Sequence, residues 1–515
     1  MMAFNLHFFP TFTASSPIVA NHTSVPTRLK QIAVGLQEAG LRLGDRVLIF
    51  SGNNIYFPVI FLGVLMAGGI VTGANPGFKP REIAHQLRDS GASFMVAAAS
   101  NIQTATEGAS EAGLPARNVF AFDTTIPGSA SVEIPAAHGA RHWTELLAPR
   151  ERAEKFDWVE PADARTTTCC LNYSSGTTGL PKGVEISHYS YVANGTGVIK
   201  LAEQKPDYPD FTKRSGIPVY IMPSFDFPKM LSHIAKYRVT HLVAVPPILV
   251  LLAKHPLTPK ADLSSLEIVG SGAAPLALEI AHETQNLLPR DIYVRQGWGM
   301  TEVTCTCLAW DGSNDSGTSG AVGELMPNCQ AKLMSLDGTT EITKAETRGE
   351  LWVTGPTLMR GYWKNAKATQ DSTSVDADGT RWLKTGDIAY VESYKPGTLF
   401  HVVDRLKELI KVKGRQVAPA ELEALLLEHP AVADVAVIGV DIEGEERPRA
   451  YIVPKEGLNP SGGEIASWVE TRVAPYKRLT GGVIFTDIIP KNPSGKILRK
   501  LLRDQAKAEV QKAKL

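Results

Sequence analysis

Hydrophobic and polar positions alternate in the same rhythm over residues 29–100 and 217–300. Short apolar runs such as Arg46–Phe50, Phe94–Ala98 and His241–Val245 have the length of buried strands, and stretches with helical spacing separate them. Strands that alternate with helices form parallel sheets covered by helices on both faces. The pattern therefore predicts an α/β fold.

Residues 320–403 have a different pattern, with short β-like runs between Gly, Asp and Pro turns. They predict a small barrel or antiparallel unit. Beyond residue 404 the alternation starts again, with helices expected over 419–428 and 463–473 and strands over 432–440, 449–454 and 482–487. The chain is thus expected to form a large N-terminal domain over residues 1–403 and a small α+β domain over residues 404–515.

One apolar segment is almost long enough to cross a bilayer. Tyr56–Ala74 is nearly free of charge, but it contains helix-breaking residues at Pro58, Gly63, Gly68 and Gly69. The Gly-Gly pair favours a break between a helix and a following strand. We expect a buried helix–turn–strand rather than a membrane span.

Charge and cysteine content narrow the classes of function. Lys and Arg together number 53, as do Asp and Glu, so no overall charge favours binding to nucleic acid or an anionic membrane. The five cysteines include no CxxC pair and are an odd number, which argues against a disulfide framework and a thiolate zinc site. Cys169 and Cys170 are expected to be small buried side chains of a strand.

The segment 173–184, Tyr-Ser-Ser-Gly-Thr-Thr-Gly-Leu-Pro-Lys-Gly-Val, carries the strongest chemical signal. Hydroxyl donors alternate with glycines, so the backbone can wrap closely around a polyphosphate. It is not a Walker loop, because Lys182 precedes the last glycine and no hydroxyl follows. The alternative interpretation is an ordinary Ser/Thr/Gly surface loop.

Four more motifs follow in order: Gly270–Pro275, Gln296–Glu302, Lys384–Asp387 at the end of a strand, and Lys491–Lys496. Together with the hydroxyl-rich loop they resemble the adenylate-forming superfamily of acyl-CoA synthetases, luciferases and adenylation domains, most closely 4-coumarate–CoA ligase-like enzymes. The resemblance extends over nearly the whole chain from about residue 28. It implies that a carboxylate attacks the α-phosphate of ATP, giving acyl-AMP and pyrophosphate, and that the thiol of coenzyme A then displaces AMP.

The resemblance also implies roles for the residues on the ATP side. The β- and γ-phosphates would be held by Ser174, Ser175, Gly176, Thr177, Thr178, Gly179 and Lys182. Thr301 and Glu302 would meet the α-phosphate and Mg²⁺; taken alone, Glu302 could also be a carboxylate at a helix N-terminus. The nucleotide would further contact Ala274, Gln296, Gly297, Trp298, Gly299 and Met300.

Trp298 looks like the aromatic residue that flanks adenine, although a lone Trp is more often part of a core. Asp387 would accept hydrogen bonds from the ribose hydroxyls with Arg405 close by, and its alternative is an ordinary turn residue. Lys496 would bring its charge to the α-phosphate and the attacking carboxylate. The alternative for Lys496 is a solvated surface charge.

Asp404–Lys407 resembles the superfamily's hinge, about which the small domain rotates between the two half-reactions. After that rotation Lys411 would serve the second half-reaction, and Lys413 and Gly414 would help to admit the pantetheine arm. The alternative interpretation of residues 411–416 is a basic β-hairpin turn.

The acyl pocket is the part that departs from the superfamily. Ala273, Val303 and Cys307 would line it together with Gly299. However, the chain passes from Tyr208–Ser215 directly into the next strand, so a strand, a His-bearing turn and a helix are missing near residue 215. Two explanations remain open: an imperfect gene prediction or splice form, or impaired catalysis.

Three functions follow as alternatives: a ligase for an aryl or medium-chain acyl acid, an enzyme that loads a carrier protein, and a nucleotide-binding protein that has lost catalysis. The final tripeptide Ala513–Leu515 matches the small–basic–leucine signal read by the peroxisomal import receptor. A peroxisomal location is therefore expected, with the cytoplasm as the alternative. The acid, the oligomeric state and the metabolic role stay open.

Overall fold

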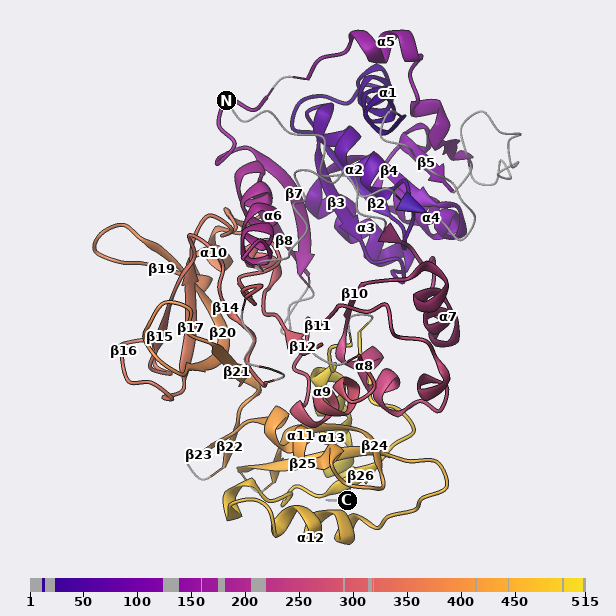
Figure 1. The fold of residues 1–515 in the computed structure, drawn as a ribbon. Helices are drawn as coiled ribbons and strands as arrows, with labels where there is room; N and C mark the ends of the chain where they lie inside the picture. Colours follow the sequence, from indigo (N-terminus) through magenta and orange to yellow (C-terminus); the bar gives the residue numbers. More distant parts are fainter. Residues whose placement is uncertain are drawn as a thin grey trace.

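The computed structural model describes residues 12–13, 24–123, 139–158, 160–174, 181–204, 219–289, 292–313, 317, 319–412, 415–442, 444–492 and 495–512 (Figure 1). Its largest sheet has the strand order β18-β8-β7-β3-β2-β4-β5-β6. The strands are β2 (Arg46–Phe50), β3 (Ile70–Ala74), β4 (Ala92–Ala98), β5 (Val119–Phe122), β6 (Arg141–His142), β7 (Thr168–Ser174), β8 (Lys182–Ser187) and β18 (Gly361–Tyr362). Those from β7 through β6 in this order pair in parallel, whereas β8 and β18 pair antiparallel.

Helices cover this sheet on both faces, as the alternating pattern predicts. The helices concerned are α1 (Ser24–Glu38), α2 (Phe57–Met66), α3 (Pro80–Ser90) and α4 (Ile102–Ala112). On strand β2, Val47 and Ile49 join a core with residues of α1 and α2. Leu48 and Phe50 point the other way and join a core with residues of α3 and α4. The period of two along β2 thus distributes its side chains between two hydrophobic layers.

The apolar segment Tyr56–Ala74 is the predicted helix–turn–strand. Helix α2 ends at Met66, Gly68 has a φ of 83°, and β3 begins at Ile70. Within the described residues, no helix has the length and apolar character that a membrane crossing requires. Cys169 and Cys170 are buried in β7, as expected.

A second parallel sheet has the order β10-β11-β12, with strands His241–Ala244, Ile268–Ser271 and Val294–Gln296. Helices α7 (Phe227–Tyr237), α8 (Pro246–Lys254) and α9 (Leu278–Gln285) share one apolar core with it. Strand β9 (Val219–Tyr220) pairs in parallel with β1 (Phe12–Thr13). The carboxyl ends of β11 and β12 lead directly into two of the predicted motifs.

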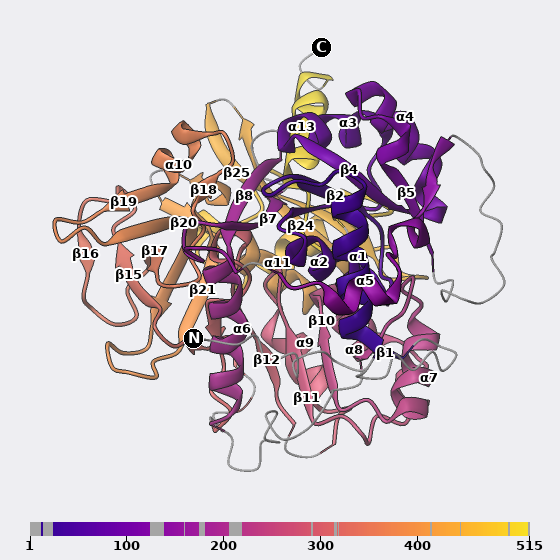
Figure 2. The same ribbon diagram turned by 90° about the horizontal axis from the view of Figure 1, so that it is seen from above.

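Residues 320–403 form the predicted antiparallel unit, which lies to one side of the large sheet in both Figure 1 and Figure 2. Its order is β16-β15-β17-β20-β19, and β21 pairs with β20. The strands are β15 (Gln330–Met334), β16 (Glu341–Ile342), β17 (Gly349–Thr354), β19 (Thr373–Val375), β20 (Arg381–Val391) and β21 (Phe400–Arg405). The remaining elements of the N-terminal part are β13 (Leu308–Ala309), β14 (Glu324–Leu325), α6 (His188–Ala202), α10 (Ala366–Ser372), and α5 (Arg150–Lys155), which packs on α1.

The prediction that Lys384–Asp387 ends a strand is wrong. Strand β20 continues to Val391, and the motif forms a bulge in its middle. Glu350 pairs with Ile388 and Trp352 with Lys384, so three residues of β20 lie opposite the single residue Leu351. Gly386, with a φ of 71°, provides the backbone conformation that the bulge needs.

The C-terminal part matches the predicted elements to within a few residues. It contains β22 (Ile410–Val412), β23 (Arg415–Val417), α11 (Pro419–Leu427), β24 (Val432–Ile442), β25 (Glu445–Pro454), α12 (Gly462–Glu470), β26 (Val483–Phe485) and α13 (Arg499–Lys512). One core lies between α11, α12 and the sheet, and a second lies between the sheet and α13. The expected boundary at residue 404 falls inside β21, and the C-terminal part lies below β10–β12 in Figure 1.

Candidate active site

Glu302 lies in a buried turn that follows the carboxyl end of β12. Glu302 is only 6% exposed, and its backbone carbonyl accepts a hydrogen bond from the Met359 N–H at 2.9 Å. The neighbouring Thr304, with a φ of 70°, donates its hydroxyl to the Thr357 carbonyl at 2.6 Å. These bonds fix the turn to residues 357–359, so the Glu302 carboxylate has a defined position.

Trp298 and Asp387, which the resemblance places on adenine and ribose, are in direct contact. The indole Nε1–H donates to Asp387 Oδ2 at 2.9 Å, and Arg405 Nε lies 3.0 Å from Asp387 Oδ1. Asp387 and Arg405 are paired across β20 and β21. Asp387 is 4% exposed, and the indole and the guanidinium compensate the burial of its carboxylate. The nucleotide contacts of both residues stay predictions.

Lys496 reaches this region from the other end of the chain. Its backbone is held in a short loop, where its N–H donates to Asn492 Oδ1 at 2.9 Å. Gly495 has a φ of 79°, and a Cβ there would lie 2.8 Å from Pro247 at the start of α8. Burial and the Arg405 guanidinium lower the pKa of Lys496, while Asp387 and Glu302 act in the opposite direction. The predicted lysine therefore shares one electrostatic environment with both predicted carboxylates.

A further cation, Lys407, belongs to the same environment. Desolvation and the charge of Arg405 lower its pKa, with Lys496 adding to the effect and Glu408 and Asp387 opposing it. Arg405, Lys407 and Lys496 thus share this environment with the carboxylates of Asp387, Glu302 and Glu408. Cations at this place can neutralise the charge of an anionic polyphosphate.

The base of the hydroxyl-rich loop lies beside this cluster. Ser174 at the end of β7 pairs with Lys182 at the start of β8. Lys182 Nζ lies 4.9 Å from the ring centroid of Tyr362, and the Tyr362 hydroxyl donates to Glu302 Oε1 at 2.8 Å. The predicted phosphate residues Ser175, Gly176, Thr177, Thr178 and Gly179 lie outside the described residues.

The two motifs around the ends of β11 and β12 are joined by hydrogen bonds. The Gly297 N–H donates to the Ser271 carbonyl, and the Leu276 N–H donates to Gln296 Oε1, both at 2.8 Å. Between them Ala273 has a φ of 72°. A Cβ at Gly299 would lie 1.6 Å from the Cys305 carbonyl oxygen, so only glycine fits. The two motifs, which contain Ala274 and Met300, therefore lie next to each other at the carboxyl ends of β11 and β12.

Two of the residues that the sequence predicts for the acyl pocket are buried in a core. Val303 and Cys307 are each 1% exposed and pack into the core of the large sheet, so their contact with a substrate stays a prediction. The segment near residue 215, where a deletion is expected, lies outside the described residues.

Lys411 is not part of the cluster around Glu302. It is exposed on β22, and its backbone N–H donates to Glu446 Oε2 at 2.7 Å. Its strand packs on β25 of the C-terminal sheet. Lys413 and Gly414 lie outside the described residues, as do Ala513, Lys514 and Leu515. The structure thus brings one of the two predicted lysines to the site, and this lysine is Lys496.

The carboxylates fit a magnesium ion only together with substrate phosphates. Among the residues that the structure describes, no group of three or more His, Cys, Asp or Glu side chains could hold a metal. Mg²⁺ is commonly bound through one or two carboxylates, several waters and the phosphates of a substrate. Glu302, buried beside Lys182's partner Tyr362, offers one such carboxylate.

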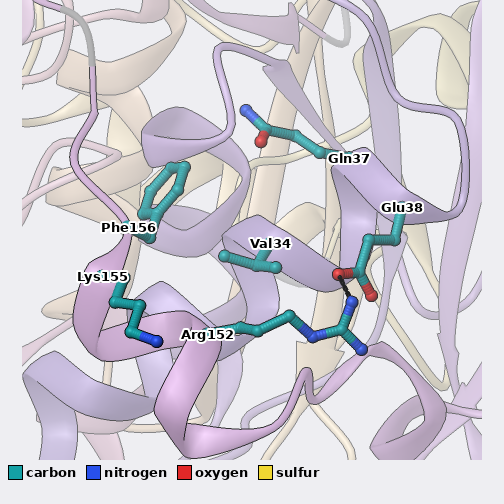
Figure 3. A pocket seen from close by; sticks show the side chains of 6 residues that line it. All are labelled: Val34, Gln37, Glu38, Arg152, Lys155 and Phe156. Carbon is teal, nitrogen blue, oxygen red and sulfur yellow. Dashed lines mark hydrogen bonds and ion pairs between the residues drawn. The ribbon is translucent and has the colours of Figure 1, made fainter.

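A surface hollow elsewhere on the molecule is separate from the candidate site. Helices α1 and α5 border a surface depression of about 460 Å³, lined by Val34, Gln37, Glu38, Arg152, Lys155 and Phe156 (Figure 3). Arg152 and Glu38 form an ion pair of 2.6 Å across it. None of the predicted site residues lines this depression.

Three comparisons with known proteins agree with the geometry. The AMP-binding enzyme family matches residues 20–210 and 211–363, and the AMP-binding enzyme C-terminal domain matches residues 421–496. A phenylacetyl-CoA ligase of Aspergillus niger is 38% identical over 505 residues, which cover 93% of this chain and 90% of the relative. A 4-coumarate–CoA ligase-like protein of Arabidopsis thaliana is 36% identical over 513 residues, covering 92% and 84%.

The solved structures share the fold. ATP-bound MatB from Rhodopseudomonas palustris superposes with a TM-score of 0.82 at 23% identity, over 98% of this chain and 97% of that one. An anthranilate CoA ligase in complex with anthranoyl-AMP has a TM-score of 0.81 at 23% identity, over 98% and 95%. The predicted fold class is confirmed, and the chain belongs to the AMP-binding enzyme family.

Proposed function

We propose that this AMP-binding enzyme is an acid–CoA ligase whose substrate is an aryl or medium-chain acyl carboxylic acid. The reaction is the ATP-dependent activation of a carboxylic acid to acyl-AMP, followed by transfer of the acyl group to coenzyme A. The observation that carries the proposal is the 3.0 Å ion pair of Arg405 with the buried Asp387, in an electrostatic environment that Asp387 and Glu302 share with Lys496.

The first half-reaction joins two anions, and the cations serve that step. A carboxylate oxygen attacks the α-phosphorus, the bond between the α-phosphorus and the bridging oxygen breaks, and pyrophosphate leaves. Lys496 and Arg405 neutralise the charge of the approaching carboxylate and of the α-phosphate, and they hold both groups in line. Glu302 with Thr301 would hold Mg²⁺, which neutralises phosphate charge when it is bound.

The second half-reaction needs a different surface of the C-terminal domain. The thiol of coenzyme A gives its proton to water and its sulfur attacks the acyl carbon, the bond between that carbon and the AMP oxygen breaks, and AMP leaves. Lys411 faces solvent here, while Lys496 is at the site. A rotation near β21, at Asp404–Lys407, would exchange the two lysines. We propose this rotation as the link between the two steps.

The class of acid is supported by the relatives and by a small residue. The Aspergillus niger relative is named a phenylacetyl-CoA ligase. After the end of β11, Ala273 has a small and exposed side chain. A small residue beside the reacting carboxylate would leave room for a ring or a medium chain.

The test is a panel of aromatic and medium-chain acids incubated with the full chain, ATP, Mg²⁺ and coenzyme A. Acid-dependent release of pyrophosphate together with a CoA thioester is the expected result. ATP binding without pyrophosphate release from any acid would contradict the ligase and favour the nucleotide-binding alternative. A higher thioester yield on a carrier protein than on free coenzyme A would favour the loading enzyme.

We also propose that Ala513–Leu515 directs the protein to peroxisomes. The described part of α13 ends at Lys512, so the tripeptide follows this helix directly. A fluorescent protein joined to the N-terminus of the chain should accumulate in peroxisomes, and the variant Leu515→Asp should not. A cytoplasmic signal from the unaltered fusion would reject this location.

A further inference from the structure

Tyr362 connects two residues that the ATP reaction needs. Its hydroxyl donates to Glu302 Oε1 at 2.8 Å, and its ring lies under the ammonium group of Lys182 at 4.9 Å from the centroid. Glu302 follows β12, Lys182 begins β8, and Tyr362 ends the short edge strand β18. The three residues come from segments that are far apart in the sequence.

The position of Tyr362 is set by its backbone, independently of its hydroxyl group. It pairs with Val184 on β8, two residues from Lys182, so its side chain lies on the same face of the sheet as the lysine. Its N–H donates to Thr369 Oγ1 at 2.9 Å. A Cβ at the preceding Gly361 would lie 2.9 Å from the Thr369 side chain, which shows how closely β18 approaches α10. Phenylalanine at position 362 should therefore keep the same place.

Both contacts of the side chain restrict a charged group. A hydrogen bond from a phenol to a buried carboxylate fixes the rotation of that carboxylate, and it is stronger than a bond between neutral groups. An aromatic ring within about 6 Å of an ammonium group attracts it and limits its range of positions. Neither contact involves a reacting atom, so Tyr362 would act through its two neighbours.

We propose that Tyr362 is a positioning residue that presets Glu302 for the metal and Lys182 for the phosphates of ATP. The hydroxyl acts on Glu302, and the ring acts on Lys182. The two functions can be separated, because Tyr362→Phe removes the hydroxyl alone, whereas Tyr362→Leu removes both the hydroxyl and the ring. This inference rests on the proposed ATP-dependent activation.

Nucleotide binding gives a readout that does not require turnover. The affinity for ATP is measured by calorimetry with Mg²⁺ and with a chelator, on the full chain and on each variant. With Tyr362→Phe, the affinity for metal-free ATP should stay unchanged, and the gain in affinity that Mg²⁺ brings should shrink. With Tyr362→Leu, the affinity for metal-free ATP should also fall, by roughly 2- to 5-fold, as expected for loss of a cation–π contact.

The rate of acyl-AMP formation should also depend on the contact between the Tyr362 hydroxyl and Glu302. For Tyr362→Phe, acyl-AMP formation should slow by roughly 10- to 100-fold, the range expected for loss of a hydrogen bond to a charged group. In a Glu302→Gln background the Tyr362→Phe change should have a much smaller effect, because its partner has lost its charge. Thioester formation from supplied acyl-AMP should change little.

Tyr394→Phe is the matched control. Tyr394 is exposed in the connection between β20 and β21, and its hydroxyl donates to the Ile342 carbonyl, so the control also loses one phenolic hydrogen bond. If Tyr362→Phe lowers the melting temperature but leaves the Mg²⁺ gain and the rate unchanged, Tyr362 is only structural and the inference is wrong. If the unaltered chain forms no acyl-AMP from any acid, the proposed function fails, while the binding measurements still decide the role of Tyr362.

Discussion

The C-terminal domain carries two lysines in different settings. Lys496 lies in a loop that touches α8, and its pKa responds to Asp387 and Glu302 of the N-terminal part and to Arg405 at the end of β21. Lys411 lies on the hairpin β22–β23, is exposed, and has its backbone bound to Glu446 within its own domain. Under the proposed function, this arrangement would serve the first half-reaction. If both lysines act, the C-terminal domain needs two orientations.

The segment between these lysines explains how the present orientation is held. Asp404 belongs to β21 through its backbone, which pairs with Ile388, but its side chain accepts a hydrogen bond from the Ala420 N–H of α11 at 2.9 Å. Asp404 is therefore bonded both to the antiparallel sheet and to helix α11 of the C-terminal domain. Rotation of the C-terminal domain has to break one of these attachments. The following predictions test the difference between the two lysines and this connection.

The largest effect is expected from the buried ion pair that fixes the first turn of α13. Arg499 binds both carboxylate oxygens of Glu423 and also donates to the Val437 carbonyl at 3.1 Å. Arg499→Leu leaves buried carboxylates without their partner and should cost roughly 3–5 kcal/mol of unfolding free energy. Denaturant unfolding measures it.

Arg503→Leu is the control for that change, since Arg503 binds Glu408 at 2.6 Å from a more exposed position. Arg503→Leu should lower the free energy of unfolding by clearly less than Arg499→Leu does. Adding Glu423→Gln to Arg499→Leu should recover part of the loss, because the amide keeps an oxygen for the Val437 N–H. No recovery would mean that the charge of Glu423 is not what destabilises the variant.

Lys496→Ala should lower the rate of acid-dependent exchange between ATP and pyrophosphate by roughly 100- to 1000-fold, as for removal of one group that stabilises transition-state charge. Lys500→Ala, on an exposed position in the same segment, is the matched control and should behave as the unaltered protein. Exchange at a normal rate in Lys496→Ala would show that the lysine is only a neighbour of the site.

Lys411→Ala should have the opposite profile. Exchange between ATP and pyrophosphate should continue, and thioester formation should slow by roughly 10- to 100-fold, the size of one lost contact to a charged group. Lys395→Ala, an exposed lysine of the antiparallel unit, serves as the control. An equal loss in both half-reactions would remove the distinction between the two lysines.

The smallest effect concerns pH and the connecting carboxyl group. Burial raises the pKa of Asp404 to about 6, although Arg499 and two backbone N–H groups oppose the shift. Because the folded protein binds the proton more tightly than the unfolded chain, this group's contribution to stability decreases as the pH rises through about 6.

Asp404→Asn removes that titration and keeps an oxygen for the Ala420 N–H. Between pH 4.5 and 7.5 the unaltered protein should lose roughly 1–2 kcal/mol of unfolding free energy relative to the variant. Unfolding curves at several pH values measure the difference. A constant difference across this range would show that Asp404 does not titrate there.

The sequence predicts the layers of the fold well, because they depend on local periodicity. The alternation around Arg46–Phe50 and the Gly-Gly break after α2 are visible in the order of residues alone. The bulge at Lys384–Asp387 is not, since a glycine in a turn-like motif equally predicts the end of a strand.

The sequence predicts which residues belong to the candidate site, but it does not predict which of them touch one another. Lys496, Glu302 and Asp387 were found through their motifs. The bond between Trp298 and Asp387 joins positions that are 89 residues apart, and no local pattern reports it. The sequence does not single out Tyr362, because a tyrosine on a short edge strand has no distinctive spacing. Its contact with Glu302 is visible only in the structure.

The most direct test of the two-lysine account supplies the intermediate. Lys496→Ala is given preformed acyl-AMP and coenzyme A, and the thioester is followed with time, beside Lys411→Ala and the unaltered protein. We predict that Lys496→Ala forms thioester at a rate close to that of the unaltered protein, while Lys411→Ala is slow. If Lys496→Ala is as slow with acyl-AMP as it is with ATP and acid, the assignment of the two lysines to separate half-reactions is contradicted.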